Sequence, residues 1–259
     1  MAHNLKVVKI GGNVINDDAQ LSSLLRDFAA LPGPKILVHG GGKLATELNK
    51  KLDIPIQMFE GRRITKDQDL EIVVMVYAGL INKKITAELQ AQQCNAIGLA
   101  GCDANMMLAA KRPAAPVDFG WVGDIKQVNA STLQLLIDQG LTPVFCAISH
   151  DGQGQLLNTN ADTVAAEIAA AMAPHYPTEL IFCFEKKGVL MDVQDENSVI
   201  EHIDFQNYQP VLADGVIHEG MLPKLKNCFY ALENQVAQVK IGAAAMLADH
   251  QAIHTTIVP

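Results

Sequence analysis

Short runs of β-forming residues that end in glycine alternate with segments of helical periodicity throughout this 259-residue chain. VVKI at 7–10 is followed by two glycines and ILVH at 36–39 by three, while residues 19–30 and 43–52 have the spacing of helices. Strands that are joined through helices run parallel, with right-handed crossovers. The sequence therefore predicts an α/β fold in which helices cover both faces of a mostly parallel sheet.

The same alternation continues to the C-terminus. The further strands that we predict are NAIGLAG (95–101), a pair of short strands in VDFGWVGDIKQV (117–128), LTPVFCAI (141–148), QLLN (155–158), ELIFCF (179–184), VKIG (239–242) and TTIV (255–258). The turn DGQG separates LTPVFCAI from QLLN, and these two strands are expected to form a hairpin.

Three more helices are predicted: one from the capping-box pair Thr65 and Gln68 to about Gln93, one from Ala161, and one over 221–234. The interruption APHYPT places a lobe boundary near Pro174. The predicted lobes are therefore residues 1–174 and residues 175–259.

Composition and charge restrict the function. Hydrophobic residues make up 49% of the chain and aromatic residues only 5%, so the core is expected to be aliphatic. The formal net charge of −8 argues against nucleic acid as the main partner. No signal peptide or apolar run of about 18 residues is found, so a cytoplasmic protein without membrane association is expected. The five cysteines are widely spaced without a CxxC motif, which is typical of buried, reduced thiols.

Glycines and charged residues gather where predicted strands end and helices begin. Lys9 precedes a double glycine, a triple glycine follows His39, NTNAD (158–162) ends a strand, and GMLPK (220–224) opens a helix. Backbone N–H groups at such turns and helix N-termini bind anions, and parallel strands bring them to one edge of the sheet. His39 is expected to orient its turn rather than to act as a base. The P-loop pattern is absent and GxGxxG does not follow the first strand, so neither familiar nucleotide motif explains these turns.

These motifs, KIGG (9–12), VHGGG (38–42), GRRIT (61–65), LLNTNAD (156–162) and GMLPK (220–224), resemble the amino acid kinase superfamily over nearly the whole chain. NTNAD together with GMLPK resembles the branch that phosphorylates N-acetyl-L-glutamate in arginine biosynthesis. The resemblance implies a three-layer αβα sandwich, ATP with Mg²⁺, and phosphoryl transfer to the side-chain carboxylate. The product would be an acyl phosphate, formed in the second step of that pathway.

The resemblance also implies roles for the two lobes. The lobe of residues 1–174 would bind the acyl-amino acid and mediate dimerisation, and the lobe of residues 175–259 would bind ATP.

The resemblance assigns roles to individual residues as well. Lys9 and Lys224 match the lysines that stabilise the transition state, and Asp162 matches the aspartate that holds both lysines in position. Substrate contacts are implied for Gly41, Gly42, Arg63 and Asn158. Contacts with phosphate or ATP are implied for Gly11, Gly12, Asn160, Glu185 and Gly188. Gly11, Gly12, Gly41 and Gly42 would surround the transferred phosphoryl group with N–H donors.

Two positions need comment within this assignment. Arg63 would grip the α-carboxylate of the substrate, but Arg62 beside it carries the same side chain, and only the motif alignment favours Arg63. Glu185 stands in FEKKGVL (184–190) where the family usually carries aspartate.

The chemistry is consistent with these residue types. A glutamate-type carboxylate with a pKa near ~4.3 is ionised at neutral pH, so the acceptor needs no general base. Catalysis would consist of positioning and electrostatic stabilisation by lysines and N–H donors. Magnesium would be carried by the phosphates of ATP and water, and no metal cage of protein ligands is expected.

Alternatives remain open at this point. The acceptor could be N-succinyl-L-glutamate, or another small molecule such as carbamate or aspartate, or the chain could be a non-catalytic ligand sensor. The intact lysine pair argues against the sensor, and the absence of chain for regulatory domains argues against an aspartokinase. Because Lys9 lies close to Met1, no N-terminal helix of the kind found in arginine-inhibited hexamers is expected, and a homodimer insensitive to arginine is predicted.

Overall fold

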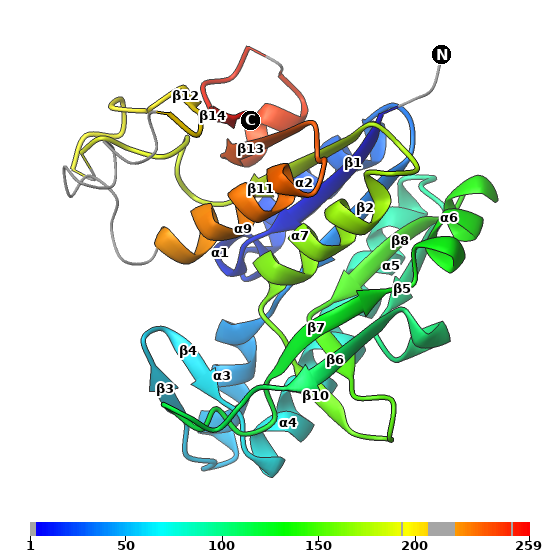
Figure 1. The fold of residues 1–259 in the computed structure, drawn as a ribbon, viewed down its shortest axis with the longest axis vertical. Helices are drawn as coiled ribbons and strands as arrows, with labels where there is room; N and C mark the ends of the chain where they lie inside the picture. The colour runs from blue at the N-terminus through cyan, green and yellow to red at the C-terminus, as the bar shows by residue number, and fades with distance from the viewer. Residues whose placement is uncertain (1–3, 193, 207–220, 250) are drawn as a thin grey trace. The chain divides into compact units, whose positions relative to one another are not determined.

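The computed structural model describes residues 4–192, 194–206, 221–249 and 251–259, along which helices and strands alternate (Figure 1). The strands are β1 (Leu5–Ile10), β2 (Lys35–His39), β3 (Gln57–Phe59), β4 (Arg62–Ile64), β5 (Ala96–Leu99), β6 (Met107–Lys111), β7 (Gly123–Val128), β8 (Thr142–Cys146), β9 (Ile148–His150), β10 (Leu156–Asn158), β11 (Thr178–Cys183), β12 (His202–Ile203), β13 (Gln238–Gly242) and β14 (Thr255–Ile257). The α-helices are α1 (Gly12–Ile15), α2 (Asp18–Ala30), α3 (Gly42–Lys51), α4 (Asp67–Val74), α5 (Asn82–Ala91), α6 (Ala130–Asp138), α7 (Ala161–Met172) and α9 (Leu222–Glu233). A π-helix, η1 (Met75–Ile81), and two 3₁₀-helices, η2 (Asp103–Asn105) and η3 (Ala244–Leu247), are also present.

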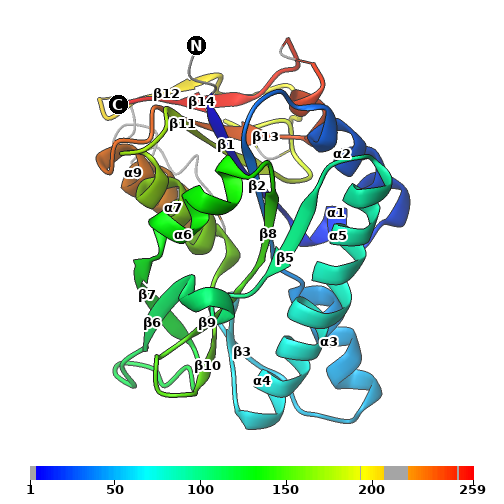
Figure 2. The same cartoon turned by 90° about the vertical axis from the view of Figure 1, so that its right-hand side faces the viewer.

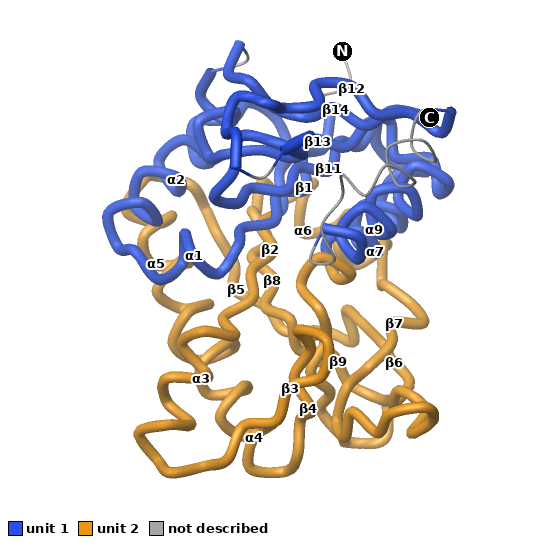
Figure 3. The backbone as a smooth tube through the Cα atoms, turned by 90° about the vertical axis from the view of Figure 1, so that its left-hand side faces the viewer, with its two compact units in different colours: residues 1–36, 165–259 blue, residues 37–164 orange. Residues whose placement is uncertain are grey.

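Packing divides the chain into two compact units, which are coloured separately in Figure 3. The first unit consists of residues 1–36 and 165–259, and the second of residues 37–164. These boundaries differ from the predicted lobe boundary near Pro174. The assignment of substrate and ATP to separate lobes stays a prediction.

The first unit is built on five neighbouring strands in the order β12-β14-β13-β11-β1. Neighbours are parallel except for β13 and β14, which are antiparallel. Helix α9 and the 165–172 part of α7 lie on one side of β1 and β11, and α2 lies on the other (Figure 2). Every residue of β11 is buried, as expected for a central parallel strand. The predicted mostly parallel sheet with helices on both faces is confirmed in this unit.

The second unit contains three parallel strands in the order β2-β8-β5, with α5 and α6 on opposite sides of β5 and β8 (Figure 2). A four-stranded sheet β10-β9-β6-β7 and the β3-β4 pair complete the unit. The predicted hairpin is confirmed, because β9 and β10 pair antiparallel across the DGQG turn. The predicted strand 141–148 is divided at Ala147 into β8 and β9.

The capping box predicted at Thr65 and Gln68 is wrong. Helix α4 begins at Asp67, and its N-cap, Lys66, makes no side-chain capping hydrogen bond. Thr65 is fully buried, and its hydroxyl oxygen instead accepts a hydrogen bond of 2.9 Å from the Asn158 amide. Tertiary packing therefore uses the threonine in place of a local cap.

The helix predicted over the same region is real but irregular. It consists of α4, η1 and α5 without an intervening loop, so its last helical residue is Ala91. A π-helical segment widens the turn and is uncommon within α-helices, where it often occurs near functional sites. Residue spacing gave no indication of it.

The pair of strands predicted in residues 117–128 is also wrong. One strand, β7, pairs antiparallel with β6, and the preceding residues form backbone hydrogen bonds with Thr65. Thr65 N–H donates to the Phe119 carbonyl at 2.9 Å, and Trp121 N–H donates to the Thr65 carbonyl at 2.7 Å. Gly120, at φ 69°, allows this approach, because a Cβ atom there would collide with the Thr65 carbonyl.

All five cysteines are free thiols, as predicted. Four of them are buried, namely Cys94, Cys146, Cys183 and Cys228. Cys102 is exposed, contrary to the prediction, because it lies in the turn that precedes η2. Among the described residues, no helix has both the length and the apolar character needed to cross a bilayer.

Candidate active site

In the first unit, Lys9 and the double glycine follow directly from the register of two parallel strands. Lys9 on β1 lies opposite Phe182 on β11, and the next pair is Ile10 with Cys183. Gly11 N–H continues the ladder by donating to the Cys183 carbonyl at 3.0 Å. Helix α1 then begins at Gly12, which is exposed. The glycines therefore lie at the carboxyl end of β1, where open parallel sheets bind ligands.

Lys224 has an unusual environment for a lysine. It lies in the first turn of α9, where the helix dipole disfavours a cation, and only 9% of its surface is exposed. Its ammonium nitrogen lies 4.8 Å from the centroid of the Phe182 ring and 5.9 Å from that of Phe184. The aromatic faces offset part of the cost of burying the charge.

The charges of both lysines act on the same thiol. Burial raises the pKa of Cys183 to about 12, and the positive charges of Lys9 and Lys224 both oppose this rise. Residues from opposite ends of the chain thus place two ammonium groups within electrostatic reach of the end of β11. Their catalytic role stays a prediction.

The loop after β11 carries the other two residues assigned to ATP in this unit. Glu185 is exposed, whereas Gly188 is buried. A Cβ atom on Gly188 would lie 2.6 Å from both the Thr255 hydroxyl and the Val199 side chain, so close packing requires glycine. Val189 N–H donates to the same hydroxyl at 2.8 Å. Of the motif GMLPK, Gly220 lies outside the described residues.

In the second unit, the triple glycine is packed against the π-helix. A Cβ atom on Gly41 would collide with Ile81 and would lie 2.8 Å from Cδ1 of Tyr77. Gly42 is the first residue of α3, and its α-carbon faces the Tyr77 hydroxyl. Burial raises the pKa of Tyr77 to about 12, with the Arg63 charge opposing the rise. The π-helix η1 therefore packs directly against the glycine turn.

Arg63 is buried and held at both guanidinium nitrogens. Nη1 forms an ion pair of 3.3 Å with Asp69, which is itself 3% exposed. Nη2 donates to the Thr46 hydroxyl at 2.5 Å and to the Gly42 carbonyl at 3.2 Å. Arg62 is exposed, so burial distinguishes two arginines that sequence alone leaves ambiguous. The arrangement fixes the plane of one guanidinium beside a glycine turn, and both hydrogens of Nη2 are already donated to Thr46 and Gly42.

Asn158 is hydrogen-bonded to Thr65, which lies two residues after this arginine. Its amide donates to the Thr65 hydroxyl, and its backbone N–H donates to the Trp121 carbonyl at 2.9 Å. The segments that contain Arg63, Trp121 and Asn158 are therefore joined by backbone and side-chain hydrogen bonds. Of the predicted substrate-binding residues, the structure brings together Gly42 and Arg63 directly, and Asn158 through Thr65.

Asn160 and Asp162 lie at the start of α7. The Asn160 side-chain oxygen accepts from the backbone N–H groups of Asp162 at 2.8 Å and Thr163 at 3.1 Å. Asn160 is therefore the N-cap of this helix, a role that sequence reasoning missed. The signal was available, because asparagine directly precedes a strongly helical run. The proposed contact with phosphate would be left to its amide nitrogen.

Sequence reasoning also missed the residues that support the predicted ones. Asp69 and Thr46 hold Arg63, and Tyr77 and Ile81 pack on Gly41. Asn82, at 1% exposure, contacts the His39 imidazole. No local pattern marks these residues, except that Asn82 is a polar side chain directly after the apolar run MVYAGLI.

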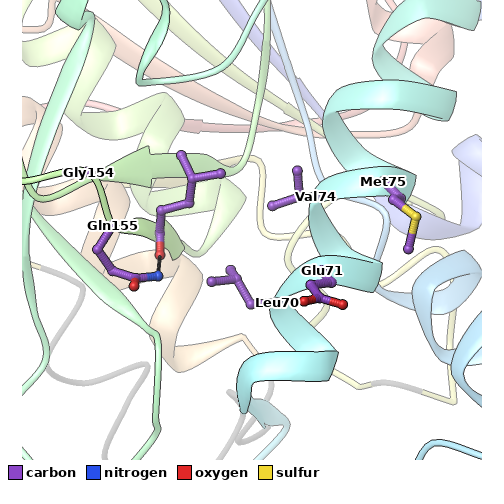
Figure 4. Close-up of a pocket in the computed structure, with 7 residues that line it drawn as sticks. Leu70, Glu71, Val74, Met75, Gly154 and Gln155 are labelled. Atoms are coloured by element: carbon purple, nitrogen blue, oxygen red, sulfur yellow. Dashed lines mark hydrogen bonds between the residues drawn. The ribbon is translucent and has the colours of Figure 1, made fainter.

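A pocket of about 500 Å³ opens elsewhere in the second unit, between the α4–η1 junction and the β9–β10 hairpin (Figure 4). Its lining residues are Leu70, Glu71, Val74, Met75, Gly154, Gln155 and Leu156. Among the lining residues that the structure describes, Glu71 alone carries a charge, and none is a predicted site residue. An apolar, weakly acidic pocket does not suit an anionic nucleotide or acyl-amino acid.

Comparison with known proteins places the chain in a family. The model of the amino acid kinase family matches residues 4–243. The chain belongs to the amino acid kinase family.

Within that family, similar curated proteins include acetylglutamate kinases. The acetylglutamate kinase of Cytophaga hutchinsonii is 51% identical over 246 residues, which cover 95% of this chain and 93% of that protein. The acetylglutamate kinase of Parabacteroides distasonis is 49% identical and covers 98% of both chains.

Solved structures share the fold at lower identity. N-acetylglutamate synthase from Neisseria gonorrhoeae, complexed with coenzyme A and N-acetyl-glutamate, matches 99% of this chain and 59% of that one, with a TM-score of 0.82 and 19% identity. Carbamate kinase from Giardia lamblia bound to AMP-PNP matches 99% of both chains, with a TM-score of 0.72 and 13% identity. The predicted amino acid kinase fold is confirmed.

Proposed function

We propose that this protein transfers the γ-phosphoryl group of ATP to the side-chain carboxylate of N-acetyl-L-glutamate, in the second step of arginine biosynthesis. The observation that carries the proposal is the 51% identity to an acetylglutamate kinase over 95% of the chain. The product is an acyl phosphate, and the enzyme is a phosphotransferase with a carboxyl group as acceptor.

The two lysines near Cys183 provide the charge that this reaction needs. A carboxylate attacks a phosphoryl group that is already anionic, so the barrier contains a large electrostatic component. Lys9 and Lys224 neutralise the charge that develops on the oxygens of the migrating group. Gly11 and Gly12 offer N–H donors at the end of β1, and Asp162 is the proposed partner that orders the lysines. The attacking carboxylate is already ionised, so no side chain has to remove a proton.

Arg63 and Asn158 are the proposed recognition groups for the acceptor. The immobilised guanidinium of Arg63 would bind the α-carboxylate, which free acyl-amino acids carry in addition to the reacting side chain. Asn158 would bind the acylamino group, and Gly41 and Gly42 would border the reacting end. Two hydrogen bonds support this assignment. Arg63 donates to the Gly42 carbonyl, and Asn158 donates to Thr65, which lies two residues after Arg63 in the same segment.

ATP is proposed to bind as its magnesium complex, with contacts from Gly11, Gly12, Asn160, Glu185 and Gly188. Magnesium supplies charge neutralisation on the phosphates when it is bound. Among the described residues, no group of three or more histidine, cysteine, aspartate or glutamate side chains could hold a metal ion. A cation carried mainly by phosphate oxygens and water needs no such group of side chains.

The location and assembly belong to the same proposal. We place the protein in the cytoplasm as a homodimer, with the acyl-amino acid in the lobe of residues 1–174 and ATP in the lobe of residues 175–259. Sedimentation of the purified protein tests the assembly, since a monomer or a hexamer would contradict it. Added arginine is expected to leave the activity unchanged.

The activity is tested by supplying ATP, Mg²⁺ and one acceptor acid at a time. ADP release is followed by a coupled assay, and hydroxylamine converts an acyl phosphate into a hydroxamate that is measured separately. We expect both signals with N-acetyl-L-glutamate, and kcat/KM for N-succinyl-L-glutamate, carbamate and aspartate measured in parallel decides among acceptors. A folded protein that phosphorylates none of these acids contradicts the proposal.

Variants of the lysines connect the activity to the site. Lys9→Met and Lys224→Met are each expected to lower kcat by about 10²–10³, the cost of removing one electrostatic stabiliser. Lys226→Met, two residues after Lys224 on the same helix, is the matched control. An unchanged kcat in both of the first two variants would remove them from the mechanism.

A further inference from the structure

A buried chain of hydrogen bonds ends on the triple glycine of the second unit. The ring nitrogen Nδ1 of His39 lies 2.8 Å from the Gly40 carbonyl oxygen, and Nε2 lies 3.1 Å from the Asn82 amide nitrogen. The same amide nitrogen lies 2.9 Å from the Val144 carbonyl, and the Asn82 oxygen lies 3.1 Å from the ammonium of Lys83. The chain therefore runs from a surface lysine to the peptide that begins the turn.

The two ends of this chain fix the direction of every hydrogen bond in it. The Lys83 ammonium can only donate, so it selects the oxygen of Asn82. The Asn82 nitrogen then donates to the Val144 carbonyl and to Nε2 of His39. The Gly40 carbonyl can only accept, so Nδ1 of His39 must carry the proton. A neutral imidazole with its proton on Nδ1 satisfies all of these bonds at once.

The environment keeps the imidazole in that neutral form. His39 is fully buried, and burial lowers its pKa to about 4, with the positive charge of Lys83 acting in the same direction. The hydrogen bond to Gly40 opposes the shift only in part. At neutral pH, the ring is therefore a donor on one side and an acceptor on the other.

A glycine in the neighbouring strand leaves space for this chain of hydrogen bonds. Gly98 on β5 lies beside it, and a Cβ atom there would collide with the Asn82 oxygen and would lie 2.9 Å from the Lys83 ammonium. Lys83 also donates to the Gly98 carbonyl at 3.0 Å. On the other side of the turn, Tyr77 and Ile81 occupy the position of a Gly41 side chain. The turn is thus held from two directions.

Because the peptide is planar, holding the Gly40 carbonyl also sets the direction of the Gly41 N–H. The Gly40 carbonyl and the Gly41 N–H belong to one planar trans peptide, so they point in opposite directions. Fixing the carbonyl toward His39 therefore aims the Gly41 N–H away from the imidazole. Glycine has little conformational preference of its own, so three glycines in sequence need an external group to choose one orientation.

We propose that His39 and Asn82 are positioning residues for phosphoryl transfer, because they hold the Gly40–Gly41 peptide so that its N–H group faces the bound ligand. The inference rests on the proposed kinase function. Neither side chain contacts the reacting groups in this account, and His39 is not a general base. Loss of the hydrogen bond to Gly40 should lower kcat and leave substrate binding largely intact.

Two substitutions of His39 separate the two hydrogen bonds of its ring. The amide nitrogen of asparagine reproduces Nδ1, so His39→Asn keeps the bond to Gly40. The side-chain oxygen of glutamine can take the place of Nε2 as acceptor, so His39→Gln keeps the hydrogen bond from Asn82 and loses the bond to Gly40. We expect kcat to fall by about 10² in the glutamine variant and by less than about tenfold in the asparagine variant, with KM for both substrates little changed.

A merely structural role gives a different result. Both variants would then lose stability to urea without this selective loss of kcat, and equal kcat values in the two variants would overturn the inference. If the wild-type protein phosphorylates no acid, the proposed function fails and the kinetic comparison does not apply.

The ring itself provides a measurement that needs no variant and no activity. In protein labelled with ¹⁵N-histidine, we expect His39 to be neutral at pH 7 with its proton on Nδ1 and a bare Nε2. A proton on Nε2, or a charged ring, would break the chain of hydrogen bonds and overturn the inference even for an active kinase.

Discussion

At the scale of single residues, Arg63 has more polar partners than a structural role alone would need. Its charge is paired with Asp69, and its second nitrogen donates to Thr46 and to the Gly42 carbonyl. A buried arginine with only a structural role could be replaced by an apolar residue together with its acid. The connection to the glycine turn is what favours a role in binding.

Arg63→Lys tests that role. Lysine keeps a positive charge for Asp69 but cannot reproduce the planar guanidinium that Thr46 and the Gly42 carbonyl hold in place. We expect KM for the acyl-amino acid to rise roughly 10- to 100-fold, the value of one charged hydrogen bond, with KM for ATP unchanged. Arg62→Lys is the control, because the adjacent arginine is exposed. An equal effect of the two substitutions on KM would show that Arg63 does not bind the acyl-amino acid.

The buried histidine predicts how stability depends on pH. The pKa of His39 is about 4 in the folded protein and 6.5 in the unfolded chain, so the unfolded state binds more protons between these values. Stability must therefore fall as the pH is lowered through this window. Between pH 7 and pH 5, wild-type protein should lose about 2 kcal/mol more of its free energy of unfolding than His39→Asn.

Urea denaturation at both pH values measures this difference. All other histidines are shared by the two proteins, so the comparison isolates position 39. Equal losses in wild type and variant would mean that the ring is protonated in the fold at pH 5.

Short motifs single out candidate site residues, whose roles stay predictions, but no motif marks the residues that support them. Lys9, Arg63 and Lys224 belong to short motifs with recognisable neighbours. Asp69 and Asn82 act through contacts that arise only when α4 and α5 pack beside the turn. A single sequence contains no local signal for such contacts.

At the scale of elements, short apolar runs, several of which end in glycine, predicted most strands of the β12-β14-β13-β11-β1 and β2-β8-β5 series. Strand β6, MLAAK, was not predicted, because its residues favour helices and only pairing with β7 and β9 makes it a strand. The short strands β3, β4 and β12 were missed as well. Segments that depend on partners far along the chain are those that propensity cannot identify.

The N-terminus of α7 gives a prediction about an element and a ligand together. Asn160 caps this helix, so Asn160→Ala should cost about 1 kcal/mol of stability, and Asn160→Ser should retain most of it. Asn160→Asp also keeps the cap but adds a negative charge. If the side chain faces the phosphates as proposed, KM for ATP should rise roughly tenfold in the aspartate variant alone.

Thermal unfolding and steady-state kinetics of the three variants separate the two roles. A KM for ATP that is the same in the serine and aspartate variants would leave Asn160 with capping as its sole role.

At the scale of the whole molecule, the compact units show why a lobe boundary is difficult to read from sequence. The first unit combines residues 1–36 with residues 165–259, so its paired strands β1 and β11 come from distant parts of the chain. Composition changes along the chain reveal only breaks between consecutive segments. Parallel pairing of β1 with β11 is a long-range contact, and the pattern of either strand is compatible with several neighbours.

The reactivity of the five thiols tests the packing of both units in one experiment. Burial raises the pKa of Cys146 and of Cys183 to about 12, and Cys94 and Cys228 are also buried, whereas Cys102 is exposed. A thiol reagent needs an accessible thiolate, and partial burial and Asp103 raise the pKa of Cys102 as well. Exposure still gives Cys102 the advantage, so one thiol should react faster than the other four in the native protein at pH 8, and five should react in guanidinium chloride. Cys102→Ser should remove the rapid phase and leave four thiols that react only as fast as the fold opens. A second rapid thiol in the native protein, or a rapid phase that survives Cys102→Ser, would show that one of the two cores is open.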